Sequence, residues 1–298
     1  MRKAFSIVLV LVFTVGIIFA GPEKYDAAKF QDVGKMAKKL VEANLKNLKK
    51  HGVTKVVIIE CYGEFLTSRE VEAGAMEQRH SNWTTKSTST IELGSDYYET
   101  VANYMFETTK KLFEENGIEV VSKEVLIENP DYIELGLKEE KKTRGYTGGV
   151  TKKSVTTEGI KRSTTGMGMV TGLFSAIGQT VKLSQLIPKI VYDTGSNATV
   201  KVNFYVDKAK NGAPILSSYN IILDSDLKTA KAGKGKVTYY LGASVTALSL
   251  KNGVMSMEDI SGAEKGSVDM EKYHNALSEI VESVEKYYSF SIKEALAK

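Results

Sequence analysis

The sequence predicts an α/β (α+β) sandwich with a mixed sheet, flanking helices, an antiparallel meander in its second half and a C-terminal amphipathic helix. The run Val56–Ile59 is β-branched and continuous, which is typical of a strand covered on both faces. Apolar residues recur at helical spacing over residues 97–112 and 270–287. Residues 199–206 alternate apolar and polar side chains, as a half-buried strand does.

The amino terminus predicts export. Arg2 and Lys3 precede an uncharged apolar run from Ala4 to Ala20. This pattern predicts a cleaved signal peptide over residues 1–20, and therefore an exported protein. A retained membrane anchor is the alternative, because about 17 apolar residues can just cross a bilayer. No cysteine follows the run, so lipid attachment there is not expected. Residues 21–298 are expected to form a single domain with polar insertions at about 64–95 and 143–178.

The first elements follow from apolar spacing. Residues at steps of three and four predict an amphipathic helix over Tyr25–Lys50, ended by His51-Gly52. Val53–Tyr62 is then expected to be a central strand. The polar stretch from Gly63 to Ser95 fits either a long loop or an exposed hairpin.

A helix and a second strand follow. Ser95 or Asp96 can cap a helix that ends at Asn116-Gly117. Ile118–Val121 is predicted to be a strand, and the right-handed crossover rule places it parallel to the first strand. Asp131–Lys142 is expected to form a short helix after Asn129-Pro130.

Residues 143–172 are rich in glycine, threonine and basic side chains. From Lys138 to Arg162 there are eight basic and three acidic residues, an excess of five (8 − 3). A mobile, solvated insertion is one interpretation. The other is a surface for an acidic partner, a lipid head group or a glycan, formed by Lys141, Arg144, Lys152, Lys153, Lys161 and Arg162. The next stretch is a candidate apolar contact for a partner or a membrane, through Met167, Met169, Leu173, Phe174 and Ile177.

The second half carries the meander. A strand over residues 199–206 is followed by a turn at Asn211-Gly212 and a return strand over 215–223. Residues 237–250 alternate again, and Asn252-Gly253 predicts a second tight turn into 254–257. The last helix, over residues 267–288, should bury a stripe of Met270, Tyr273, Leu277, Ile280, Val284 and Tyr287.

Catalytic chemistry is sparse. The chain has one cysteine and three histidines, so neither a disulfide nor a structural zinc site is expected, and we predict no catalytic, cofactor or metal residue. Cys61 is expected to be an inert core thiol. Glu60 and Glu64 could serve as the carboxylates of a secreted hydrolase. Removal of Arg2 and Lys3 lowers the net charge from +4 to +2 (4 − 2), so no nucleic-acid partner is expected.

The order of elements resembles a known family. Residues 56–60, the helix around 97–113 and Asn116–Val121 are similar to the first half of the periplasmic α/β domain shared by the curli secretion channel protein CsgG and the amino-terminal domain of TolB. Leu186–Ile190, then 195–198 and the strand over 200–206, resemble its second half. CsgG-like proteins carry a cysteine after the signal and two amphipathic hairpins, and this chain lacks the cysteine.

This resemblance implies a non-enzymatic cell-envelope protein with a periplasmic or outer-membrane location. Such a protein would bind an envelope protein or associate with itself as an accessory or assembly factor. A CsgG-like oligomeric secretion pore is the alternative. The two polar insertions occupy the places of the pore-forming hairpins, but neither alternates apolar and polar residues over about ten positions, as a membrane strand does. The carboxylate-dependent hydrolase is the third hypothesis.

Overall fold

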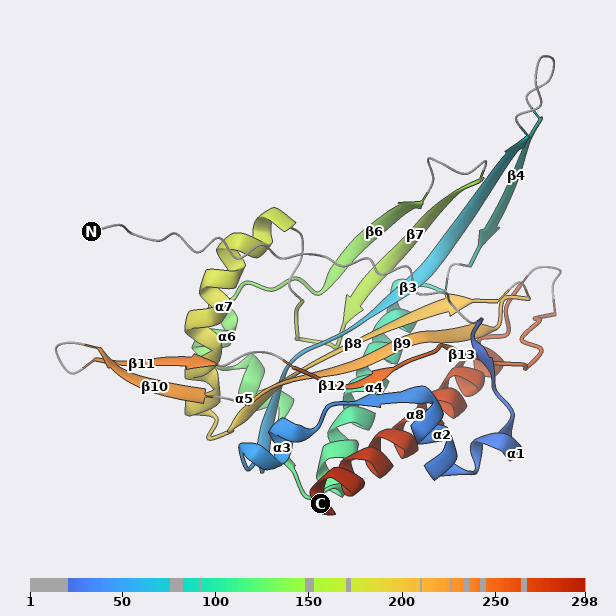
Figure 1. The fold of residues 1–298 in the computed structure, drawn as a ribbon. Helices are drawn as coiled ribbons and strands as arrows, with labels where there is room; N and C mark the ends of the chain where they lie inside the picture. The colour runs from blue at the N-terminus through green and yellow to red at the C-terminus, as the bar shows by residue number, and fades with distance from the viewer. Residues whose placement is uncertain are drawn as a thin grey trace.

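The protein has a mixed α/β fold, as the sequence predicts. A computed structural model describes residues 21–75, 83–91, 93–147, 153–169, 173–209, 211–225, 227–232, 236–241, 245–263 and 267–297. These residues form a mixed sheet of 11 strands, a separate two-stranded sheet and flanking helices (Figure 1). The predicted signal peptide lies outside the described residues.

The elements are named in chain order. The helices are α1 (Ala27–Phe30), α2 (Val33–Leu40), α3 (Lys46–Lys50), α4 (Ser95–Glu115), α5 (Lys123–Ile127), α6 (Pro130–Glu134), α7 (Leu173–Asp193) and α8 (Met270–Ala297). The first strands are β1 (Glu23–Lys24), β2 (Val41–Ala43), β3 (Lys55–Ala75), β4 (Trp83–Thr90), β5 (Glu119–Val120), β6 (Glu140–Thr147) and β7 (Lys153–Ser163). The later ones are β8 (Ala198–Lys208), β9 (Pro214–Asp224), β10 (Leu227–Ala232), β11 (Lys236–Leu241), β12 (Val245–Leu250) and β13 (Val254–Met255).

The 21-residue strand β3 organises the main sheet. It pairs in parallel with β5 and β8 and in antiparallel with β7 and β4. The parallel pairing of β3 with β5 confirms the predicted direction of these two strands. The main path of the sheet is β1-β13-β9-β8-β3-β7-β6, and β10 pairs with β11 outside it.

Burial changes along β3 in three steps. Residues 56–61 are all buried, which requires cover on both faces. From Cys61 to Phe65, buried and half-buried residues alternate, so only one face is packed. Residues 67–72 are all half-buried, and there the strand leaves the core. The predicted strand, Val53–Tyr62, therefore covers only the packed part of β3.

Helices α4 and α8 cover one face of the sheet (Figure 1). The ring of Phe65 on β3 stacks on Tyr98 of α4, with centroids 4.6 Å apart. Tyr219 on β9 packs on Tyr288 of α8 at 5.2 Å. The opposite face is polar beside the core, where the Asn220 amide donates to Asn203 Oδ1 at 2.9 Å.

The last helix confirms its predicted stripe apart from one residue. Five of its members are buried: Tyr273, Leu277, Ile280, Val284 and Tyr287. The prediction that Met270 is buried is wrong. The helix begins at this residue, and Met270 is 37% exposed. The predicted cap of α4 is also wrong. Gly94 precedes this helix with φ of 84° and no side-chain cap, while the Ser95 hydroxyl donates to Glu140 at 2.7 Å.

The predicted single helix over Tyr25–Lys50 is wrong. Asp26 and Asp32 each accept backbone N–H groups and start separate helices, α1 and α2. Residues 41–43 then form β2, which pairs with β12 at the edge of the sheet. Backbone pairing with the sheet outweighs helical periodicity at these three residues. The predicted helix over Asp131–Lys142 is also too long, because α6 ends at Glu134 and β6 begins at Glu140.

The second half confirms the β8–β9 hairpin and corrects the predicted strands after it. Residues 237–250 are not one strand, because β11 pairs with β10 and β12 pairs with β9. Strands β12 and β13 run in the same direction along β9, so Asn252-Gly253 joins two segments of one sheet edge and is not a hairpin turn. A Cβ atom at Gly253 would lie 3.0 Å from Ser217 Cα, so the close approach of the chains requires glycine there.

A core substitution in α8 tests this packing. Ile280 is fully buried, and Ile280→Ala should lower the free energy of unfolding by about 2–5 kcal/mol, because it leaves a cavity. Urea denaturation measures the change. The exposed neighbour Glu279 provides the control, since Glu279→Ala should change stability by less than about 0.5 kcal/mol. Similar losses in both variants would contradict the assigned face of the helix.

Candidate functional site

Four strands extend beyond the packed core. The ends of two hairpins, β3–β4 and β6–β7, lie side by side in the order β6-β7-β3-β4 (Figure 1). We call the part formed by residues 68–75, 83–90, 140–147 and 153–158 the projection. At about 3.3 Å per residue, the eight residues Ser68–Ala75 carry it roughly 25 Å outward. Helix α4 contacts the base of this sheet through an ion pair with Arg162.

The projection settles the two open predictions for the polar insertions. Residues 63–95 contain a hairpin, which is one of the two predicted alternatives. A mobile, solvated insertion over residues 143–172 is wrong for the described part, because β6 and β7 pair along their length. Threonine and valine favour extended backbone without requiring a buried face. A polar sheet can therefore form from a sequence that has no apolar alternation.

Two features fix where the projection leaves the core. The pairing of β3 with β7 shifts register between Leu66 and Ser68, which marks a β-bulge. Bulges bend a strand and increase its twist. Just beyond the bulge, Arg69 donates to Asp207 of β8 at 2.7 Å and ties the base of the projection to the core.

The projection carries charges of both signs on its surface. Glu70 and Lys86 form a 2.9 Å ion pair between β3 and β4, and Arg144 on β6 lies opposite Glu158 on β7. Tyr146, also on β6, is 69% exposed. A large exposed ring amid polar side chains is typical of a contact residue at protein interfaces.

The six predicted basic residues do not form one free patch. Arg144 is exposed and Lys141 half-buried, both on β6. Lys161 lies 3.2 Å from Glu64 and over the ring of Tyr62. Lys152 lies outside the described residues, and only the backbone of Lys153 is described.

Arg162 is a structural residue. Its side chain is 17% exposed, and its guanidinium pairs with Glu99 of α4 and, at 3.5 Å, with Glu140 of β6. Hydrogen bonds from Thr165 and Arg162 hold the pKa of Glu99 below its ordinary value. The ion pair with Glu99 raises the pKa of Arg162. This cluster joins α4, β6 and β7, so its positive charge is not available to a partner.

The predicted apolar contact is not a continuous surface. Met167 and Met169 are 0% and 1% exposed, and Met169 pairs with Lys138 in an isolated bridge. They fill the core, which corrects their predicted exposure. Leu173, Phe174 and Ile177 lie in α7, and their side chains are outside the described part of the chain.

The candidate hydrolase carboxylates do not share a described cavity. Glu64 Oε2 pairs with Lys161, and Glu64 Oε1 accepts from the Thr143 hydroxyl at 3.0 Å. Glu64 lines a small hollow of about 120 Å³ at the base of the projection, and Glu60 does not line it. Cys61 is buried in the core, as predicted, and burial raises the pKa of its thiol to about 12.

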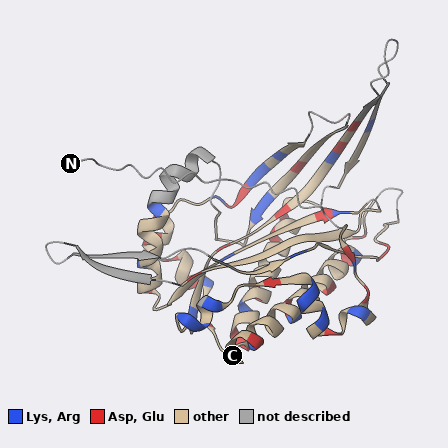
Figure 2. Cartoon of the chain, in the orientation of Figure 1, with Lys and Arg blue, Asp and Glu red and all other residues tan. Residues whose placement is uncertain are grey.

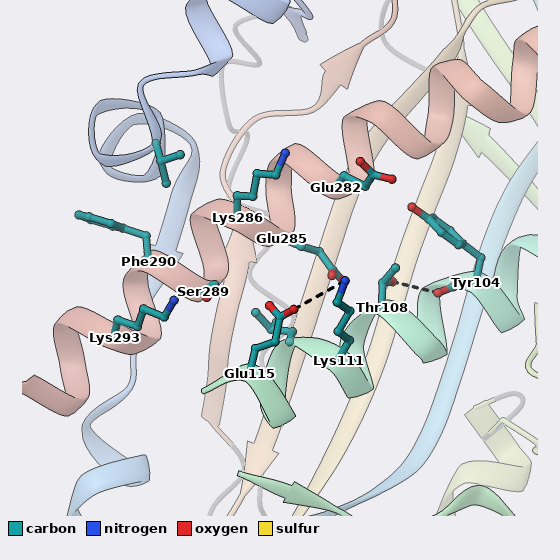
Figure 3. A pocket seen from close by; sticks show the side chains of 12 residues that line it. Tyr104, Thr108, Lys111, Glu115, Glu282, Glu285, Lys286, Ser289, Phe290 and Lys293 are labelled. Carbon is teal, nitrogen blue, oxygen red and sulfur yellow. Dashed lines mark hydrogen bonds and ion pairs between the residues drawn. The ribbon is translucent and has the colours of Figure 1, made fainter. Parts of the chain in front are cut away.

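A cleft between α4 and α8 has no counterpart among the sequence predictions. Its volume is about 660 Å³, and Lys111, Glu115 and Lys286 lie around it (Figure 3). Glu285 lies at its inner end, where the Tyr219 hydroxyl donates to Oε1 at 2.7 Å. Burial raises the pKa of Glu285 to about 7, against the opposing effect of hydrogen bonds from Tyr219 and Thr108. Helical periodicity cannot predict the burial of Glu285, because this residue lies beside the apolar stripe of α8 and still reaches the sheet.

Comparisons with known proteins add no assignment. None of the helices in the described part of the chain combines the length and apolar character that crossing a membrane requires. Within the same residues, no cluster of three or more His, Cys, Asp or Glu side chains could hold a metal ion. No family model, curated protein or solved structure matches the chain.

The Arg162 cluster makes a stability prediction. Arg162→Met should lower the free energy of unfolding by about 2 kcal/mol, because Glu99 and Glu140 lose a partly buried charged partner. Arg144→Met, at an exposed position of β6, should change it by less than about 0.5 kcal/mol. Urea unfolding curves measure both. Equal effects would show that Arg162 does not join the helix to the sheet.

Glu285 makes a pH prediction. Its carboxyl has a pKa of about 7 in the folded protein and an ordinary value of 4.5, so the folded state binds more protons between these values. Stability should therefore fall as pH rises through this window. Glu285→Gln should remove on the order of 2 kcal/mol of this fall between about pH 5 and 8. Glu282→Gln, at an exposed position of α8, is the control and should leave the slope unchanged. An unchanged slope in Glu285→Gln would contradict the prediction.

Proposed function

We propose that the protein is a non-enzymatic, exported cell-envelope protein that acts by binding another protein or by associating with itself, as an accessory or assembly factor. The projection carries this proposal. Its outer strands, β4 and β6, each pair on one side only among the described residues. An unpaired strand edge presents N–H and C=O groups that a further strand can bond.

The composition of the projection supports selective contact. Lys86, which pairs with Glu70, places charge on the outer strand β4, and charge on an open edge blunts unspecific aggregation. The exposed Tyr146 on β6 supplies apolar area at one of these edges. The apolar run at residues 4–20 supports export, because it has the charge pattern and length of a signal peptide.

One observation favours a second candidate, the CsgG-like oligomeric secretion pore. The two hairpins come from separate stretches of the chain and lie side by side in a single sheet. Assembly would then join β4 of one copy to β6 of the next. Charged side chains along the described strands, such as Glu70 and Glu158, count against a lipid-facing surface. We therefore keep the accessory role as the first proposal.

Light scattering with and without mild detergent tests self-association. We expect a discrete oligomer, and the double variant Thr88→Lys with Tyr146→Lys should shift it toward monomer, because both substitutions place charge on the outer strands. Ile133→Lys is the matched control, since Ile133 is 64% exposed on α6, away from the projection. A monomer under both conditions would contradict self-assembly and leave binding to another protein. Detergent-dependent rings would favour the pore.

A further inference from the structure

A second cleft lies on the side of α8 that faces the N-terminal segment. It lies between the C-terminal half of α8 and the segment formed by α2, β2 and α3, and its volume is about 860 Å³. Five lysines line it: Lys38, Lys46, Lys49, Lys50 and Lys251. Glu294 is the one acidic residue that lines it in the described part of the chain. We call this cleft the lysine groove. In Figure 2, blue segments of the ribbon mark the basic residues of α2 and α3.

Among the described residues, these five lysines form no ion pair with a carboxylate. All five are exposed, and none lies within 4.0 Å of an acidic group among the residues that the structure describes. Lys251 Nζ donates to the backbone oxygen of Lys38 at 3.2 Å, which holds Lys251 at one end of the groove. By contrast, the predicted basic residues Lys161 and Arg162 are both paired with glutamates.

Helix stability does not account for the whole set. Lys38 lies in the last turn of α2, and Lys49 and Lys50 in the last turn of α3, where cations stabilise the helix dipole. Lys46 is the first residue of α3, where a cation is unfavourable. Lys251 lies in the connection between β12 and β13, outside any helix. Their positions are explained by a ligand with negative charge more readily than by the helices.

The floor of the groove is apolar. Its apolar lining consists of the buried residues Ala37, Val41 and Leu45, the half-buried Phe290 and Ala295, and the exposed Ala43 at the edge. A volume of this size suits a small amphiphile, whereas a folded protein partner typically buries about 800 Å² of each surface. An apolar floor under a rim of cations matches a molecule with an anionic head and an acyl chain.

We propose that the lysine groove binds anionic phospholipid at a membrane surface, with the phosphate among the lysines and an acyl chain along the apolar floor. Each lysine near an anionic membrane strengthens binding by about fivefold, so the groove should dominate membrane affinity in a chain that is otherwise near neutral. This inference does not rest on the projection, and the two can fail separately.

Vesicle sedimentation tests the proposal with the full chain. The probes are phosphatidylcholine vesicles with and without about one third phosphatidylglycerol, and the neutral vesicles measure the contribution of residues 1–20. Replacing Lys46, Lys49 and Lys50 by Glu should reduce binding to anionic vesicles at least about 100-fold. The charge-matched control replaces Lys138, Lys142 and Arg144 by Glu and should change binding much less. Lys→Gln versions of the triple variant check that lost binding is not lost folding.

Two further measurements separate binding in the groove from adsorption by charge and from a protein partner. Ala43→Glu places a carboxylate at the edge of the apolar lining and should weaken vesicle binding by itself. Dependence on the lysines without dependence on Ala43 would mean surface adsorption by charge alone and would overturn the proposal. Binding of poly-glutamate through these lysines with no vesicle binding would identify an acidic protein partner and also overturn it. Equal vesicle binding by the wild type and by the triple variant at Lys46, Lys49 and Lys50 would also overturn the proposal.

Discussion

The hydrogen-bonding requirement of β3 constrains the rest of the fold. Its backbone groups need partners along 21 residues, and four strands supply them in turn. β5 and β8 pair near its start, β7 and β8 around Glu64, and β7 and β4 beyond the bulge. Strand β4 therefore pairs with β3 beyond the end of β8, and the β6–β7 hairpin pairs with it beyond β5. Core and projection are one sheet because they share one strand.

The sequence allows prediction of elements that bury a face. The stripe of α8, the parallel pairing of β3 with β5 and the β8–β9 hairpin all follow from period or turn chemistry. The far half of β3 could not be predicted, since a strand without a buried face shows no alternation. The spacing of residues 41–43 suits a helix, while the open edge of β12 decides their conformation.

The sequence also does not allow prediction of which charged side chains in the candidate sites are paired. A local excess of lysine and arginine can be counted, but which cations already have partners depends on distant carboxylates. Arg162 forms an ion pair with Glu99, which is 63 residues away in sequence, so its charge is not available to a partner. The segment from Lys35 to Lys50 has six lysines and one glutamate, and it leaves the cations of the lysine groove unpaired among the described residues. Glu285 shows the converse, since burial beside the sheet is invisible in a helical pattern.

The bulge between Leu66 and Ser68 and the Arg69–Asp207 pair lie where a force on the projection would enter the core. A load applied to its tip passes through the covalent backbone of β3 directly into the centre of the sheet. Ladder hydrogen bonds lie perpendicular to the strands, so a pull along β3 loads many of them together in shear. The projection and the core should therefore resist such a pull together, because β3 belongs to both.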